Sequence, residues 1–158
     1  MDLTPYQEPI RIQSALACKR VAVVGLSSNV LRASHFVGYY LQRHGYEVVP
    51  VNPRETEVLG LTSYPTLGDI PGKVDIVDVF REPAAVPDIA RDALAIGARF
   101  LWLQYNVISE EGISIAEAGG MTVIADRCIK IEHARYRGRM YVLGFNTGEI
   151  SARRQQAG

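Results

Sequence analysis

The sequence has few cysteines and no excess of charge of either sign, and each absence excludes a class of protein. Its 158 residues include two cysteines, Cys18 and Cys128, which are too few for a disulfide scaffold and favour a reducing compartment. Lysine plus arginine number 17, as do aspartate plus glutamate, so no global basic field predicts a nucleic-acid partner. No apolar run approaches membrane-spanning length, and the polar N-terminus lacks a signal-peptide core. We therefore expect a cytoplasmic protein with no nucleic-acid and no membrane partner.

Length and apolar content fit one domain with its own core. Hydrophobic residues make up 47% of the chain, which is ordinary for a folded protein of this size. We expect a single domain over residues 1–158, with its core at about 19–135 and a C-terminal extension at 136–158.

Short apolar segments and helical patterns alternate along the chain. The buried strands are predicted at 21–25, 46–51, 74–80, 100–103 and 121–125. The helices are predicted between them, from 34 to the glycine at 45, at about 67–70, at 84–96 and at 110–118. Because helices separate successive strands, the sheet should be parallel with right-handed crossovers. We therefore predict an α/β, Rossmann-like doubly wound fold with a mainly parallel five-stranded sheet in three layers.

The segment after the first predicted strand has the composition of a phosphate-binding loop. Gly25 ends the apolar run, three small polar residues follow at 27–29, and Ser34 is the expected N-cap of the next helix. Backbone N–H groups and the helix dipole favour an anion at such a turn. Arg32 has no obvious acidic neighbour in the sequence, so it is the best single side chain for a phosphate contact.

Two features of NAD-binding folds are absent. The G-x-G-x-x-G turn is missing, and no acid follows the second predicted strand, where Asn52, Pro53 and Arg54 stand. A carboxylate there would bind free ribose hydroxyls, whereas an arginine suits a ribose that carries an extra phosphate. NADP and coenzyme A (CoA) remain as adenine nucleotides, unless Arg54 is simply solvated beyond the turn.

Several motifs stand in a specific order along the chain. They are VAVVGLS (21–27), Arg32 with Ser34, GYEVVPVNP (45–53), EVLG (57–60), VDIVDVFR (74–81), WLQYNV (102–107), DRCIKIEH (126–133) and GFNTG (144–148). In this order and spacing they resemble the small, stand-alone CoA-binding proteins, whose Rossmann-like domain is related to the CoA-binding domain of the succinyl-CoA synthetase α subunit. The resemblance covers about residues 19–150 and implies a site for CoA or acyl-CoA at the carboxyl ends of the strands.

The resemblance also implies roles for the residues that follow each strand. Those expected at the pyrophosphate are Gly25, Leu26, Ser27, Ser28 and Asn29, with Arg32 adding a charged contact and Ser34 beside it. Those expected near the adenosine ribose and its 3′-phosphate are Asn52, Pro53 and Arg54. Those expected to wall the adenine are Val79, Phe80 and Arg81, and those expected toward the pantetheine arm are Trp102, Gln104 and Asn106. The family commonly has glycine at the position of Asn106, which predicts a differently shaped pantetheine end.

Some of these residues have a purely structural alternative. Trp102 and Phe80 are equally consistent with core aromatic residues at strand ends. Arg81 could pair with Glu82 or Asp78 instead of a phosphate, and Gly25 could form a plain strand-to-helix turn. The sequence leaves these alternatives open.

No convincing catalytic constellation is visible. Cys128 and His133 would form an activated thiol only if sulfur and imidazole meet, and a cysteine after a buried strand is more often structural. The histidines and cysteines show no metal-ligand spacing, so no metal site is expected.

The leading interpretation is a CoA-binding module that is a carrier, sensor or regulatory subunit rather than an enzyme. One alternative is an enzyme that acts on CoA thioesters or CoA disulfides through Cys128 and His133. The other is an NADP-dependent reductase, which the lack of a Tyr-x-x-x-Lys pair disfavours. The protein partner and the oligomeric state stay open, a homo-oligomer included.

Overall fold

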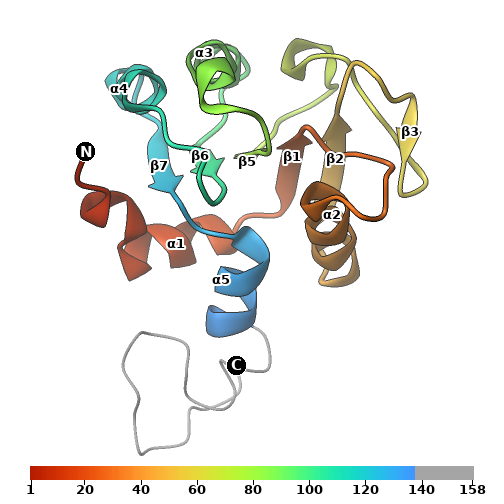
Figure 1. Ribbon diagram of the computed structural model, residues 1–158, viewed down its shortest axis with the longest axis horizontal. Helices are drawn as coiled ribbons and strands as arrows, with labels where there is room; N and C mark the ends of the chain where they lie inside the picture. The colour runs from red at the N-terminus through yellow and green to blue at the C-terminus, as the bar shows by residue number, and fades with distance from the viewer. Residues whose placement is uncertain (138–158) are drawn as a thin grey trace, which may run out of the picture.

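The computed structural model describes residues 1–137, whose centre is a five-stranded parallel sheet (Figure 1). Its strands are β1 (Arg20–Val24), β2 (Glu47–Val51), β5 (Ile76–Val79), β6 (Phe100–Leu103) and β7 (Thr122–Ala125). Every neighbouring pair is parallel, and the order across the sheet is β2-β1-β5-β6-β7. The α/β fold predicted from the alternating pattern is therefore confirmed.

Helices cover both faces of this sheet and complete the three layers (Figure 1). One face carries α3 (Val86–Ala95) and α4 (Glu110–Ala118), and the other carries α1 (Pro9–Leu16), α2 (Ala33–Arg43) and α5 (Ile129–Tyr136). The smaller elements are the 3-10 turns η1 (Thr4–Gln7), η2 (Leu67–Asp69) and η3 (Pro83–Ala85), and the antiparallel hairpin of β3 (Glu57–Val58) and β4 (Leu61–Thr62). The turn η2 lies where a short helix was predicted at about 67–70.

The strands are apolar on both faces, because both faces are covered by helices. Successive residues of β1 point to opposite sides: Ala22 and Val24 join the core under α3 and α4, whereas Val21 and Val23 join the core under α1, α2 and α5. The ends of the strands, rather than the faces of the sheet, are thus left for a ligand.

The N-terminal segment belongs to the core, although the sequence pattern predicted a core that begins at about residue 19. Ile12, Ala15 and Leu16 lie on one side of α1 and are almost fully buried. Their i, i+3, i+4 spacing is a helical signal, but it is short and stands among polar residues. The C-terminal extension predicted at 136–158 lies outside the described residues from 138 onward, as does the GFNTG motif.

The order of the strands reverses at β1. β2 lies on one side of β1, and β5, the next strand of the sheet along the chain, lies on the other. In open parallel sheets such a reversal opens a crevice at the carboxyl ends of the two strands concerned, where ligands bind. The topology therefore predicts a ligand site at the segments that follow β1 and β5.

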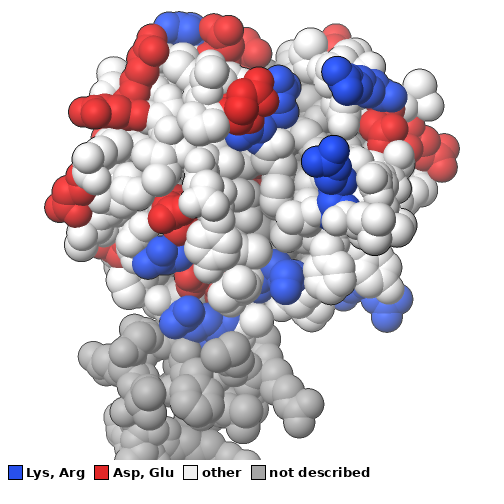
Figure 2. Space-filling view, in the orientation of Figure 1, with Lys and Arg blue, Asp and Glu red and all other residues white. Residues whose placement is uncertain are grey.

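Within residues 1–137 no helix has the length and apolar character that a membrane span requires. On the face shown in Figure 2, basic and acidic side chains are interspersed. The interspersed charges agree with the equal numbers of acidic and basic residues in the whole chain.

Replacing Gly25 with alanine should destabilise the fold strongly. Gly25 has φ +90°, and a Cβ atom there would lie 2.4 Å from the Phe80 carbonyl oxygen. We expect the free energy of unfolding to fall by about 3 kcal/mol, from backbone strain together with a clash that only a strand shift can relieve. Gly45→Ala is the matched control, since Gly45 has φ +88° but a Cβ atom there would meet nothing within 4 Å, so a loss of about 1 kcal/mol is expected. Equal losses in urea denaturation of the two variants would contradict this account.

Candidate functional site

Hydrogen bonds join three segments that follow neighbouring strands. The Gly25 N–H donates to the Val51 carbonyl (2.8 Å), and the Phe80 N–H donates to the Val24 carbonyl (2.8 Å). The Asn52 side-chain amide donates to the carbonyl of Leu26 (3.1 Å). The loop of residues 25–32, named here the phosphate loop after the ligand group that the sequence predicts for it, therefore lies beside the ends of β2 and β5. The structure thus gathers at one point the residues expected at the pyrophosphate, the ribose and the adenine.

The N–H groups of the phosphate loop point at oxygen atoms of the protein's own side chains. The Ser27 N–H donates to the Ser34 hydroxyl (3.1 Å), and the Ser28 N–H donates to the Glu55 carboxylate. The Asn29 N–H donates to the Ser27 hydroxyl (3.0 Å). Successive backbone N–H groups in a turn can bind an anion, and here each of the three already has an oxygen acceptor in the protein itself.

Ser34 is not the N-cap of α2, which corrects the sequence prediction. The helix begins at Ala33, and its N-cap residue is Arg32, whose side chain makes no capping hydrogen bond. The buried Ser34 hydroxyl instead accepts from the Ser27 N–H. Ser34 therefore holds the phosphate loop against the first turn of α2. This contact forms because the loop folds back and brings Ser27 next to Ser34.

The three arginines expected at the site have different surroundings. Arg32 and Arg54 are exposed, and neither forms an ion pair within residues 1–137. Arg81 pairs with the Glu82 carboxylate (3.0 Å), which is one of its two structural alternatives. The hydrogen bond from Arg81 lowers the pKa of the Glu82 carboxyl below its usual value. Arg32 and Arg54 are therefore the better placed of the three to meet a phosphate.

Three of the six residues expected near the adenine and the pantetheine arm are buried. Val79 and Trp102 are fully buried, and Gln104 is only 4% exposed. The Trp102 indole N–H donates to the Arg127 carbonyl (2.8 Å), so this ring is a core aromatic residue, as its structural alternative proposed. Phe80 is half-buried at the carboxyl end of the central strand β5, where it packs against the core under α1, α2 and α5.

Asn106 adopts the backbone conformation that a glycine would take. Its φ is +65°, in the left-handed region that glycine and asparagine adopt most readily. The Asn106 N–H donates to the Asp126 carboxylate (2.9 Å), which links the ends of β6 and β7. The backbone of this turn therefore tolerates the exchange of glycine for asparagine.

A buried carboxyl group lies behind the site. Asp78, in β5, is completely buried and accepts a hydrogen bond from the Gln104 side-chain amide. Its Oδ2 atom has no hydrogen-bond partner within residues 1–137. Burial raises the pKa of Asp78 to about 8, although the hydrogen bond from Gln104 acts in the opposite direction. The sequence indicated Asp78 only as a candidate partner of Arg81; the available signal was an acid, one of two with Asp75, inside the apolar segment predicted as the strand 74–80.

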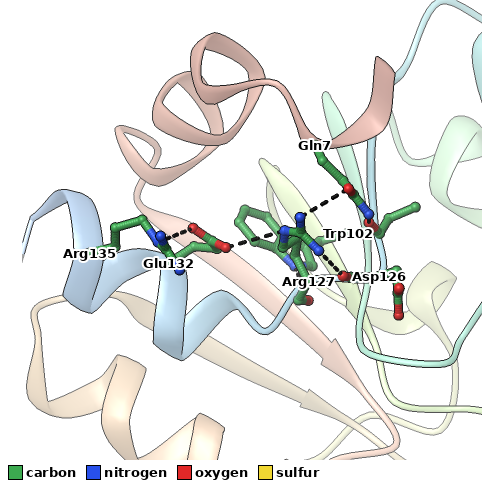
Figure 3. Close-up of polar contacts among 7 residues, drawn as sticks. Gln7, Trp102, Asp126, Arg127, Glu132 and Arg135 are labelled. Carbon is green, nitrogen blue, oxygen red and sulfur yellow. Dashed lines mark hydrogen bonds and ion pairs between the residues drawn. The ribbon is translucent and has the colours of Figure 1, made fainter. Parts of the chain in front are cut away.

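The polar segment at 126–133 forms a structural network (Figure 3). The Arg127 guanidinium donates to the Gln7 side-chain carbonyl (3.0 Å) and lies 3.5 Å from the Glu132 carboxylate. Arg135 also pairs with Glu132 (3.2 Å), and the Gln7 amide donates to the Ala125 carbonyl (3.2 Å). This network ties the N-terminal segment and α5 to the end of β7.

Cys128 and His133 do not form the hydrogen bond that an activated thiol requires, as far as residues 1–137 are concerned. Cys128 is the buried N-cap residue of α5. The His133 Nδ1 atom lies 2.9 Å from the Tyr40 hydroxyl instead, and burial lowers the pKa of His133 to about 4. The ring is therefore neutral at physiological pH and is engaged by a tyrosine rather than by the thiol.

His133 also belongs to a different end of the molecule. It lines a cavity of about 260 Å³ together with Cys18 and Lys19, which precede β1, and Tyr46, which precedes β2. The cavity thus lies at the amino ends of the strands, opposite the phosphate loop. In the described part of the chain, no group of three His, Cys, Asp or Glu side chains is arranged to hold a metal ion.

Replacing Asp78 with asparagine should stabilise the protein increasingly as the pH rises. The folded protein retains a proton on Asp78 that the unfolded chain, with a carboxyl pKa near 3.8, releases. The stability contribution of this carboxyl is therefore fully present below pH 3.8, declines as the pH rises, and is lost above about pH 8. Asparagine cannot ionise, so Asp78→Asn should exceed the wild type at pH 9 by on the order of 2 kcal/mol in urea denaturation, with little difference at pH 4.

The control for this variant is Asp92→Asn, which removes an exposed carboxylate on α3. It should change stability by a similar small amount at both pH values. If Asp78→Asn followed the same pH profile as the wild type, Asp78 would not be protonated in the folded state.

Sequence and structure comparisons identify relatives of about the same size. Residues 19–134 match the model of the CoA binding domain family. The uncharacterized protein YneT of Bacillus subtilis (strain 168) is 43% identical over 116 residues, which are 73% of this chain and 86% of YneT. The structure of a hypothetical protein from Pyrococcus horikoshii OT3 superposes with a TM-score of 0.81 at 36% identity, covering 85% of this chain and 96% of that one.

A further relative is much longer. The ADP-forming acetate–CoA ligase II of Archaeoglobus fulgidus is 31% identical over 101 residues, which are 63% of this chain but only 15% of the ligase. The family match covers most of the sheet and the phosphate loop. The chain therefore belongs to the CoA-binding domain family.

Proposed function

We propose that this protein binds CoA at the carboxyl ends of β1, β2 and β5, as a stand-alone module that acts as a carrier, sensor or regulatory subunit. The observation that carries the proposal is a run of three successive backbone N–H groups, those of Ser27, Ser28 and Asn29, each of which donates to a side-chain oxygen, beside the end of β2, which Asn52, Pro53 and Arg54 follow directly. Such donors suit a diphosphate, and an arginine suits an additional phosphate on the ribose.

The groups of CoA can be assigned to residues of this chain. The diphosphate would take the N–H groups of the phosphate loop, with Arg32 adding charge, and the 3′-phosphate would take Arg54. The adenine would lie against Phe80, which is half-buried at the carboxyl end of β5. When bound, CoA supplies a thiol or a thioester.

We propose that the protein binds CoA without converting it chemically, because the side chains of the alternative catalytic pair do not meet. The alternative enzyme needs contact between the thiol of Cys128 and the ring of His133, whereas Tyr40 lies beside that ring. The activity of the ligase relative is not carried over, because the match spans 15% of its length.

CoA should bind more tightly than dephospho-CoA, which lacks the 3′-phosphate. We expect at least a tenfold difference in Kd, about 1.4 kcal/mol, from calorimetric titration of nucleotide-stripped protein. Arg54→Ala should remove the difference, since it deletes the guanidinium expected at that phosphate. Arg43→Ala, at the far end of α2, is the matched control and should preserve it.

The same titrations separate the alternative nucleotides. NAD should not bind measurably under conditions where CoA does, because no acid stands directly at the end of β2, where Asn52, Pro53 and Arg54 lie, to hold the free ribose hydroxyls. Tighter binding of NADP than of CoA would refute the proposal and favour the reductase alternative.

A further inference from the structure

One acceptor of the phosphate loop differs from the others. Ser34 and Ser27 supply neutral hydroxyl oxygens from within or next to the loop, whereas Glu55 supplies a carboxylate from a segment 27 residues away in the sequence from its donor, Ser28. Glu55 is thus the anionic member of the set. It occupies a donor that a phosphate oxygen of a bound nucleotide would use.

The position of Glu55 is set by a turn built on Asn52. The Asn52 carbonyl accepts from the Glu55 N–H (3.2 Å), and the Asn52 side-chain oxygen accepts from the Arg54 N–H (3.0 Å). The side-chain amide of Asn52 donates to the Leu26 carbonyl (3.1 Å). One residue therefore fixes both the phosphate loop and the turn that carries Glu55, so the contact follows from the way β2 ends.

The Glu55 carboxylate has no arginine or lysine partner within residues 1–137. Its contact in this part of the chain is the N–H group of Ser28. A carboxylate held by a backbone donor and not neutralised by an ion pair repels a second anion at the same place. The side chain is only partly buried, so it can turn toward solvent when it is displaced.

We propose that Glu55 is a built-in competitor of the ligand: its carboxylate occupies the Ser28 amide, must leave before a diphosphate can bind there, and thereby lowers the affinity of the site. This inference rests on the proposed function, since it concerns the same diphosphate. The cost of displacing Glu55 is common to every ligand that places a diphosphate on the loop. Glu55 therefore sets the overall affinity, whereas Arg54 sets the discrimination for the 3′-phosphate.

The test compares CoA and dephospho-CoA binding to Glu55→Ala, Glu55→Gln and the wild type by calorimetry. We expect Glu55→Ala to bind both ligands about tenfold more tightly than the wild type, with the ratio of their Kd values unchanged. Glu55→Gln keeps an acceptor but loses the charge, so it should gain less than Glu55→Ala. The matched control is Glu57→Gln, which removes an exposed carboxylate two residues away and should leave both affinities unchanged.

A readout without ligand tests the contact itself. In an NMR spectrum of the unliganded protein, the Ser28 amide proton should move upfield in Glu55→Ala and stay in place in Glu57→Gln, because hydrogen bonding to a carboxylate shifts an amide proton downfield. An unmoved Ser28 signal in Glu55→Ala would overturn the inference.

The binding outcomes distinguish this inference from the proposed function. If the wild type binds CoA and Glu55→Ala binds it equally or more weakly, the competitor role is wrong and the proposed function stands. If neither protein binds CoA, the proposed function fails and the inference fails with it. Tighter binding by Glu55→Ala and by Glu57→Gln alike would assign the effect to net charge and overturn the specific role of Glu55.

Discussion

The close approach of Gly25 to the Phe80 carbonyl decides how the ends of β1 and β5 meet. No side chain stands between the two backbones, since a Cβ at Gly25 would lie 2.4 Å from that oxygen. The N–H group of the same glycine donates to Val51, which adds the end of β2 to the junction. Because the strand order reverses at β1, this junction is also the position where ligands bind in open parallel sheets. The phosphate loop, the turn after β2 and the residues after β5 all take their positions from it.

The phosphate loop is stabilised by the same kind of contact that it would offer a ligand. Its N–H groups donate to hydroxyl oxygens and to one carboxylate, so the loop is ordered by acceptors that resemble phosphate oxygens. Preordered donors reduce the entropy that a ligand loses on binding, but each acceptor must be replaced when a phosphate arrives. The affinity of such a site depends on this exchange and not only on the number of donors.

Much of the fold could be predicted because its signals are local. Apolar runs of four to seven residues separated by helical patterns lead directly to parallel strands with helical crossovers, and the strand at 100–103 and the helix at 110–118 have the predicted bounds. The helix α1 was missed because its apolar stripe is only Ile12, Ala15 and Leu16. At the site, the position of the phosphate loop was predictable from Gly25 and the small residues after it. A turn, like a strand or a helix, is specified by residues adjacent in the sequence.

By itself, the sequence determined the class of fold, the place of the loop that begins at Gly25, and the Asn52-Pro53-Arg54 turn directly after β2. Only the tertiary structure decided which polar groups meet there: Ser34 with Ser27, Glu55 with Ser28, and Gln104 with Asp78. It also decided that Trp102 belongs to the core and that His133 faces Tyr40 and not Cys128. The physical reason is that secondary structure follows from neighbours along the chain, whereas hydrogen-bond partners and burial depend on which segments the fold brings together across the sheet.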